Sequence, residues 1–306
     1  MAVSDLLVEV ETWQGEWFTL YGAGQGDRGV VLGERPIGLL SDEPMESIWN
    51  SHAFQTGASF GGIRIDKKDV MIGAEIIPTE NESWHENYSG WKDAWSATRD
   101  NKLWVTTPES RRFLLCRKAK APGFDPERDP FVRQHSRVDT FLTAGDPRWK
   151  EPDQPLKWVN DIDTTDVSGG EVWSFHDFWV SNPTDYPLWP MWELQAYEGA
   201  KWRLPDYSFG SDLYERADLD ANRTIQMPAL IAGEHVRVDT TDEGEQVVSS
   251  IDTQIYQRMA GVRFLYPIPA KTKKPVKLTV GVTRVPAGVG IRLVLRRNWS
   301  SPLLIG

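Results

Sequence analysis

A proline-rich break divides the chain into two halves of similar length. Val138–Thr143 alternates as a strand would, and Gly145–Pro147 ends the pattern, because glycine frees the backbone and proline removes a hydrogen-bond donor. Glu151–Pro155 then adds two more prolines and no apolar residue. A chain of 306 residues has a length typical of two domains. We therefore expect two β-rich domains, residues 1–150 and 151–306.

The first half is expected to contain strands, one helix and further strands, which makes it α+β. Asp69–Ile77 is a long β-branched run typical of an interior strand. Ser83 and Glu86 match the capping box that begins a helix, because each side chain can bond a free backbone N–H of that first turn. An aromatic stripe follows at helical spacing: Trp84, Tyr88, Trp91 and Trp95. These features predict a helix over about residues 83–98, with the stripe packed on a sheet.

The second half shows no helix signal of any length and instead has short alternating runs. Trp202–Asp206 lies between these runs and is expected to be a loop. The alternating runs are Val172–Val180, Leu188–Leu194, Arg223–Met227, His235–Asp239, Ile255–Met259, Val276–Val285 and Ile291–Arg296. Short alternating strands at this spacing predict an antiparallel sandwich.

Charge is distributed unevenly along the chain. The net charge is −10, yet residues 253–306 hold ten basic residues and no acidic one, which leaves −20 for residues 1–252. Such asymmetry predicts that the basic end faces an acidic surface of the same chain, a neighbouring copy, another protein or a nucleic acid. The N-terminus has acids where a signal peptide has lysine, so we expect synthesis and folding in a cytoplasm.

The sequence offers no recognisable catalytic, metal or cofactor site. Gly24–Gly29 matches the dinucleotide glycine pattern, but Val30–Leu32 follows where a helix should begin. The histidines are too far apart for helical metal spacing, and the single Cys116 is expected to be a buried small hydrophobe. We expect no enzyme, metal or cofactor, although carboxylates that meet only in the fold would leave a glycosidase open.

The chain has 15 tryptophans, many more than a chain of this length needs. Tryptophan suits interfaces and sugar sites as well as cores, because it combines a large apolar area with one polar atom. A carbohydrate-binding module that contacts the host cell envelope is therefore an alternative function. The tryptophans that could stack on sugars in the second half are Trp173, Trp179, Trp189, Trp192 and Trp202, and strand alternation predicts that most of them are core or interface.

Short segments along the whole chain resemble the distal tail proteins, often called minor tail proteins, of long-tailed phages that infect mycobacteria and related actinobacteria. The matching segments, in order, are Trp17–Leu20, Gly26–Val30, Ile48–Gly57, Ala144–Trp149, Val180–Asp185, Trp202–Gly210, Val236–Thr240, Gly261–Pro267 and Arg297–Ser300. The order and spacing of these segments carry the resemblance more than any one of them does.

The resemblance implies a fold and a role in the virion. The first domain would be a β-sandwich with one helix that forms a ring, usually of six copies, and the second a galectin-like or jelly-roll sandwich outside the ring. The ring would join the major tail tube protein to the hub, fibre and other minor tail proteins at the tail tip. Its lumen would admit the tape measure protein and then DNA, and no membrane would be contacted.

A ring needs two different surfaces of one copy to meet, and opposite charges on them would favour that geometry. The loop of residues 22–28 is expected to be long and flexible, and we expect it to contact a stacked ring. The basic end is expected to meet acidic surface. The candidate assembly residues are Gly24, Gln25, Gly26, Asp27, Arg28, Lys271, Lys273, Lys274, Lys277, Arg296 and Arg297.

Overall fold

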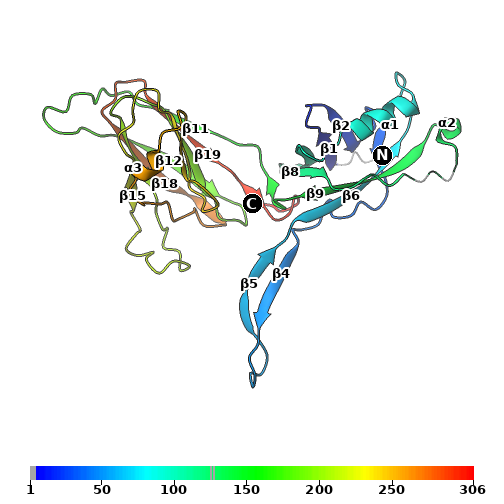
Figure 1. Cartoon of the computed structure of the whole chain (residues 1–306), viewed down its shortest axis with the longest axis horizontal. Helices are drawn as coiled ribbons and strands as arrows, with labels where there is room; N and C mark the ends of the chain where they lie inside the picture. Colours follow the sequence, from blue (N-terminus) through cyan, green and yellow to red (C-terminus); the bar gives the residue numbers. More distant parts are fainter. Residues whose placement is uncertain (1–4, 125, 127) are drawn as a thin grey trace. The chain divides into compact units, whose positions relative to one another are not determined.

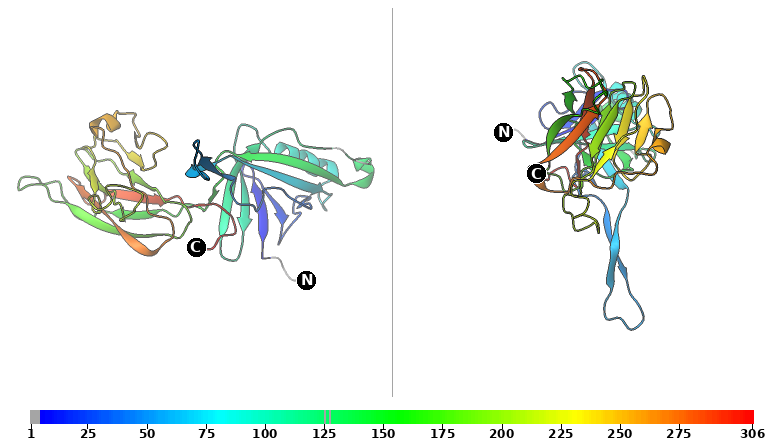
Figure 2. Two further views of the ribbon diagram at one scale, coloured as in Figure 1. Left: turned by 90° about the horizontal axis from the view of Figure 1, so that it is seen from below. Right: turned by 90° about the vertical axis from the view of Figure 1, so that its left-hand side faces the viewer.

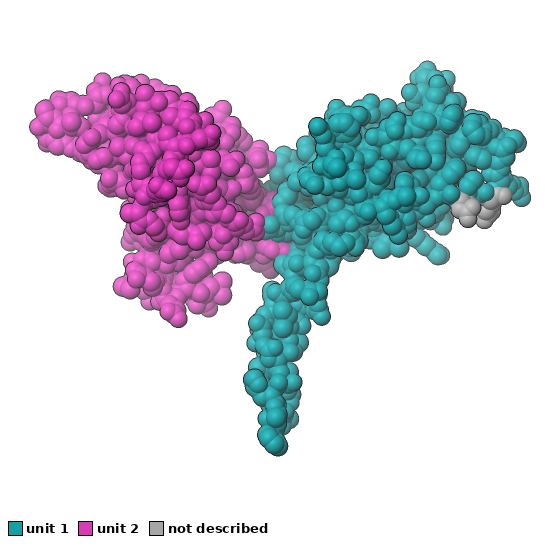
Figure 3. Space-filling model, viewed as in Figure 1, with its two compact units in different colours: residues 1–152, 299–305 teal, residues 153–298, 306 magenta. Residues whose placement is uncertain are grey.

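The computed structural model describes residues 5–124, 126 and 128–306, and its chain separates into two units (Figure 1, Figure 3). Unit 1 comprises Met1–Pro152 and Trp299–Ile305, and unit 2 comprises Asp153–Asn298 with Gly306. Strands dominate both units, so the predicted mainly-β fold class is confirmed.

Unit 1 is built on one antiparallel sheet that encloses its core. Its strands are β1 (Leu7–Glu11), β2 (Trp17–Tyr21), β3 (Val30–Leu32), β6 (Lys68–Ile76), β7 (Asn101–Thr106), β8 (Arg111–Lys118), β9 (Ser136–Ala144) and β10 (Trp149–Lys150). They follow the order β2-β1-β7-β8-β9-β6-β3, and β10 pairs with β8. The strands β8 and β9 are joined only near Arg117 and Lys118, and side chains from both sides of this joint share one buried cluster. The sheet therefore forms two walls around a core, as in a sandwich.

The predicted helix is α1 (Trp84–Asp93), and it begins as expected. The Ser83 hydroxyl accepts a hydrogen bond from the Glu86 N–H, and the Glu86 carboxylate accepts one from the Ser83 N–H at 2.7 Å. The aromatic stripe faces the core: the indoles of Trp84 and Trp91 donate to the hydroxyls of Ser136 and Thr140 on β9.

The helix ends earlier than predicted, at Asp93 rather than near residue 98. The Asn101 side-chain amide donates a hydrogen bond to the Ala94 carbonyl at 3.1 Å. The Ser96 hydroxyl accepts hydrogen bonds from the backbone N–H groups of Thr98 and Arg99. These side-chain bonds replace the helical ones, while Trp95 still reaches the core from beyond the helix end.

Unit 1 also contains a two-stranded sheet and a short helix. The hairpin consists of β4 (Met45–Asn50) and β5 (Ser59–Ile65), and the helix is α2 (Pro130–Arg133). Asp129 caps α2 by accepting a hydrogen bond from the Phe131 N–H at 2.9 Å.

The C-terminal segment belongs to unit 1, which corrects the expectation that residues 151–306 form the second half alone. Trp299, in β20 (Asn298–Trp299), is 3% exposed in the unit 1 core, and its indole donates to the Glu151 carboxylate at 2.7 Å. Arg112 is 2% exposed and donates to the carbonyls of Ser301 and Leu304 at 2.9 and 2.7 Å. These bonds hold the segment against β8, although 189 positions separate Arg112 from Ser301 in the sequence.

Unit 2 is the predicted antiparallel sandwich. The β13 sheet has the order β11-β19-β13-β16-β17, and the β18 sheet has the order β12-β18-β14-β15. The strands are β11 (Leu156–Val159), β12 (Ser174–Asn182), β13 (Pro190–Leu194), β14 (Lys201–Pro205), β15 (Thr224–Gln226), β16 (Val236–Asp239), β17 (Val247–Ser249), β18 (Thr272–Thr283) and β19 (Gly290–Leu295). One buried cluster, which includes Trp192, Val238, Val280 and Leu293, fills the space between the two sheets.

Two local expectations for unit 2 are wrong. Ile255–Met259 contains a short helix, α3 (Ile255–Arg258), rather than a strand, because Ile255 and Met259 are both buried at a spacing of four. The stretch expected to be a loop at residue 202 is strand β14, whose Trp202 and Leu204 are both fully buried. Alternation predicts strands only where the packing on both sides agrees with it.

Candidate assembly surfaces

The loop of residues 22–28 is folded back on β2 rather than long and flexible. Asp27 accepts hydrogen bonds from the N–H and hydroxyl of Thr19, both at 3.0 Å, and the Gly26 N–H donates to the Thr19 carbonyl. Arg28 pairs with Glu16 at 3.2 Å, and its guanidinium lies 4.5 Å from the centre of the Phe18 ring. The loop predicted to make contacts is thus held in one conformation against strand β2.

The close packing of this loop depends on Gly29, which ends it at a φ of +66°. A Cβ at Gly29 would lie 2.0 Å from the Asn87 side chain and 2.3 Å from the Ile77 carbonyl. The glycines that resembled a nucleotide site therefore allow a tight turn against α1, and strand β3 follows them.

The predicted basic residues lie on unit 2, and several are paired there. Lys277 binds Asp177 at 3.3 Å, and Arg296 binds Asp239 at 2.9 Å. The Arg297 guanidinium donates to the Ser181 carbonyl. Part of the charge asymmetry seen in the sequence is therefore neutralised within the unit.

Three lysines remain as an exposed basic cluster at the start of β18. They are Lys271, Lys273 and Lys274, and among the described residues their ammonium groups have no hydrogen bond or ion pair. The three lysines are thus neighbours along the chain, whereas Arg296 and Arg297 follow β19.

The β4–β5 hairpin is a surface that the sequence reasoning missed. Figure 1 and the right view of Figure 2 show that it projects from the rest of unit 1, and both strands are exposed along almost their whole length. A two-stranded hairpin is marginally stable in water on its own, and within the described part of the chain this one pairs with no third strand.

The hairpin has one apolar face and one polar face. The register pairs Met45 with Ile65 and Trp49 with Phe60 on one face, and Glu46 with Arg64 on the other. The rings of Trp49 and Phe60 meet edge to face at 5.6 Å, and Arg64 binds Glu46 at 3.4 Å. We define the apolar face as Met45, Trp49, Phe60, Ile63 and Ile65, each between 41% and 60% exposed.

This division of faces follows from strand alternation, because successive side chains point to opposite sides. An apolar strip on an otherwise solvated ribbon is typical of a surface that another chain covers. In the sequence only Ile63 and Ile65 of this face stand at alternate positions, so the strand signal was weak. Only the structure shows that no core of unit 1 receives them.

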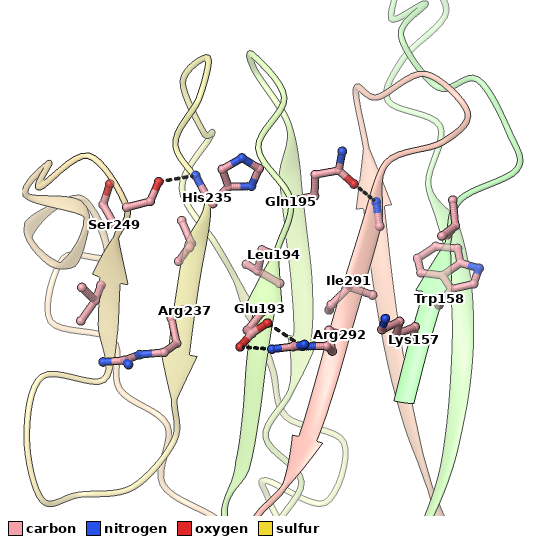
Figure 4. A pocket seen from close by; sticks show the side chains of 15 residues that line it. Lys157, Trp158, Glu193, Leu194, Gln195, His235, Arg237, Ser249, Ile291 and Arg292 are labelled. Atoms are coloured by element: carbon pink, nitrogen blue, oxygen red, sulfur yellow. Dashed lines mark hydrogen bonds and ion pairs between the residues drawn. The ribbon is translucent and has the colours of Figure 1, made fainter. Parts of the chain in front are cut away.

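Unit 2 carries a groove of about 630 Å³ on the outer face of the β13 sheet (Figure 4). Charged side chains from adjacent strands form a row across its floor, because the register pairs Lys157 with Arg292, Arg292 with Glu193, and Glu193 with Arg237. The Glu193 carboxylate binds Arg292 through two contacts, at 2.6 and 2.7 Å, and this bond raises the pKa of the arginine.

A second row beside the first is polar and uncharged. Gln195 accepts a hydrogen bond from the Gly290 N–H at 2.8 Å, and the Nδ1 of His235 accepts one from the Ala196 N–H at 3.2 Å. The backbone N–H of His235 donates to the Ser250 hydroxyl at 3.0 Å. Gly290 has no side chain, so the floor between Val159 and Gln195 stays open.

Of the five tryptophans considered for sugar stacking, two lie in the core and three are at least partly exposed. Trp192 and Trp202 are fully buried in the core of unit 2 and cannot meet a ligand. Trp173 and Trp189 are half-buried, and Trp179 is 63% exposed on β12. None of these five lines the groove, so any sugar site there must use other side chains.

Within residues 5–124, 126 and 128–306, no group of three or more His, Cys, Asp or Glu side chains is placed to hold a metal ion. No helix in this part of the chain is long and apolar enough to cross a membrane.

Comparison with known proteins finds relatives that match almost the whole chain, although no family model matches it. The minor tail protein Gp27 of Mycobacterium phage D29 is 27% identical over 341 aligned positions, which cover 97% of this chain and 98% of that protein. Minor tail protein Gp27 of Mycobacterium phage L5 is also 27% identical, with the same coverage.

Two solved structures share the fold. The SPP1 Dit (gp 19.1) protein, described as a paradigm of the hub adsorption apparatus in phages that infect Gram-positive hosts, matches with a TM-score of 0.56 and 11% identity. The match covers 96% of this chain and 99% of that one. A chain of the phage P2 baseplate matches with a TM-score of 0.50 and 9% identity over 95% of this chain. The expected resemblance is thereby confirmed: the chain is similar to Dit in fold and to the Gp27 minor tail proteins in sequence, each over nearly its whole length.

Proposed function

We propose that the chain is a structural component of a phage tail tip, without catalytic activity. Six copies form a ring that joins the major tail tube protein to the hub and to fibre or other minor tail proteins. The ring lumen is open to the tape measure protein and to DNA in transit, and the protein stays in the virion after synthesis in the host cytoplasm. The similarity to tail proteins over the full length supports this proposal.

The observation that carries the proposal is the β4–β5 hairpin. Its apolar face exposes five large side chains, although the removal of apolar area from water is favourable. Its polar face is suited to remain in solvent, because Glu46 and Arg64 satisfy each other there. A hairpin of this kind is stable when its apolar face lies on another copy of the chain.

A closed ring fits this arrangement better than a two-fold dimer. The hairpin of one copy would lie on a different surface of the next copy, which is a heterologous contact, and such contacts form a ring when the rotation between copies closes. The loop of residues 22–28 and the basic cluster at β18 are further proposed contacts within the ring or between stacked rings. The fixed geometry of the loop suits a specific contact, because little flexibility is lost on binding.

The mass of the purified protein in solution tests the proposal. Light scattering and native mass spectrometry at low and high salt should show a closed oligomer, with ring-shaped particles in electron micrographs. If the protein stays a monomer at every protein and salt concentration, the measurement is repeated with the purified major tail tube protein added. This second measurement decides whether a ring forms. A monomer in both cases would refute the ring.

A variant of the basic cluster tests whether charge contributes to assembly. Replacing Lys271, Lys273 and Lys274 with glutamine should weaken assembly at low salt and have little effect at high salt, where exposed charges are screened. Assembly that is unchanged at low salt would exclude these lysines from the interface.

A further inference from the structure

The floor of the groove in unit 2 has unpaired positive charge at both ends of its charged row. Glu193 neutralises Arg292, whereas Lys157 and Arg237 have no hydrogen bond or ion pair among the described residues. The row therefore has a net charge of +2 in a chain whose net charge is −10. This surface attracts an anion in spite of the charge of the whole protein.

The spacing of the two free cations determines how a ligand can lie. Lys157 on β11 and Arg237 on β16 are separated by the strands β19 and β13, which is three strand intervals or about 14 Å. A ligand that meets both must run across the strands. Figure 4 shows the Arg292–Glu193 pair lying between them on the floor of the groove.

The second row offers hydrogen-bond donors to the same ligand. The Gln195 oxygen is engaged by the Gly290 N–H, which leaves its amide NH₂ to donate. The His235 Nδ1 accepts a hydrogen bond, so in the neutral ring the proton lies on Nε2. Both side chains line the groove (Figure 4). A ligand rich in acceptor oxygens would satisfy these donors.

We propose that this groove binds an acidic saccharide that lies across the β13 sheet. Its carboxylates would pair with Arg237 and Lys157, and its hydroxyls would meet Gln195, His235 and the Glu193 carboxylate. Carboxylate paired with guanidinium is the strongest of these contacts, so it determines specificity for charged sugars. This proposal does not rest on ring formation, because every residue in it belongs to unit 2.

An acidic peptide fits the groove less well. A peptide that binds a sheet usually adds as a strand to a free edge and runs along the neighbouring strands. In that position it would pass near either β11 or β17, at opposite edges of the β13 sheet, and would not reach both free cations. Between the edges, Arg292, Glu193 and Arg237 of the charged row come from interior strands, whose backbone groups are already paired.

Calorimetric titration of the full chain with three probes tests the proposal. The probes are a trimer of α-1,4-linked galacturonate, the neutral galactose trimer of the same linkage, and hexaglutamate. The galacturonate trimer should bind at least about tenfold more tightly than the neutral trimer, a difference of about 1.4 kcal/mol. Binding should weaken as salt rises, because the contacts are ionic.

Two variants locate the binding surface. Arg237→Gln together with Lys157→Gln should weaken galacturonate binding by about tenfold or more. Arg216→Gln together with Arg263→Gln removes the same charge from the same unit outside the groove and should leave binding unchanged. Both pairs of residues are exposed, so each variant should have the same unfolding midpoint as the unsubstituted protein, which would show that it is folded.

Each other outcome overturns the proposal. Equal binding of the charged and neutral trimers, or no binding of either at millimolar concentration, excludes an acidic saccharide. Equal losses in the two double variants would show that only the net charge of the unit matters. Tighter binding of hexaglutamate that is lost with Arg237 and Lys157 would make the ligand a peptide.

Discussion

Replacing Trp49 with threonine removes the largest side chain from the apolar face of the β4–β5 hairpin and keeps a residue that favours strands. Trp49 is 60% exposed, and its ring contacts Phe60 within the hairpin. The substitution should therefore have little effect on the isolated chain, since one cross-strand pair contributes about 0.2–1 kcal/mol. Its main effect should appear when another copy covers this face.

The size of that effect follows from the exposed area. A tryptophan offers about 150–250 Å² for burial, so a ring that is 60% exposed leaves about 120 Å² available. At about 25 cal/mol per Å² this area is worth about 3 kcal/mol per interface. The threonine recovers a small part, which leaves about 2–3 kcal/mol, or a weakening of each contact by roughly a hundredfold.

Sedimentation velocity over a range of concentrations measures the shift of the assembly midpoint. Ile48→Thr is the matched control, because Ile48 is the adjacent residue, 44% exposed, on the polar face of the same strand. We expect Trp49→Thr to move the midpoint far more than Ile48→Thr does. Equal shifts, or no shift in either variant while both remain folded, would refute the argument that the apolar face is covered in the assembly.

Three further predictions concern buried polar groups. Arg112→Met should lower the unfolding free energy by about 3 kcal/mol and speed carboxypeptidase cleavage, because the Ser301 and Leu304 carbonyls lose their donor; unchanged cleavage would contradict this. Burial lowers the pKa of Lys68 to about 8, so between pH 8 and 10.5 the unfolded chain binds more protons and the native state gains stability as pH rises. Relative to Lys68→Met, that gain should be about 3 kcal/mol in chemical unfolding, and a flat difference would refute it. Burial raises the pKa of Cys116 to about 12, so iodoacetamide should label it at mildly alkaline pH only after unfolding; rapid native labelling would show that the thiol is accessible.

The features that could be predicted from the sequence are those set by local chemistry. The start of α1 follows from Ser83 and Glu86, which cap the helix with their own side chains. The aromatic stripe and the alternating runs of unit 2 follow from the periods of helix and strand, which any packing arrangement must respect. The failure of the glycine pattern as a nucleotide site also follows locally, because β3 begins where a helix would be needed.

The remaining features depend on contacts between residues far apart in the chain. The return of residues 299–305 to unit 1 rests on long-range contacts, among them the hydrogen bond from the buried Arg112, which lies 189 positions before Ser301. The same holds for the candidate sites. The apolar residues of the β4–β5 hairpin resemble those of a half-buried strand in sequence, and only the tertiary structure shows that the described residues leave this face exposed. Lys157, Arg292, Glu193 and Arg237 come from four strands, and the register alone places them in one row. Local sequence thus determined the start of α1 and most of the alternating strands. Tertiary structure decided the exceptions at α3 and β14 and which side chains are left for a partner, because burial depends on everything that packs around a residue.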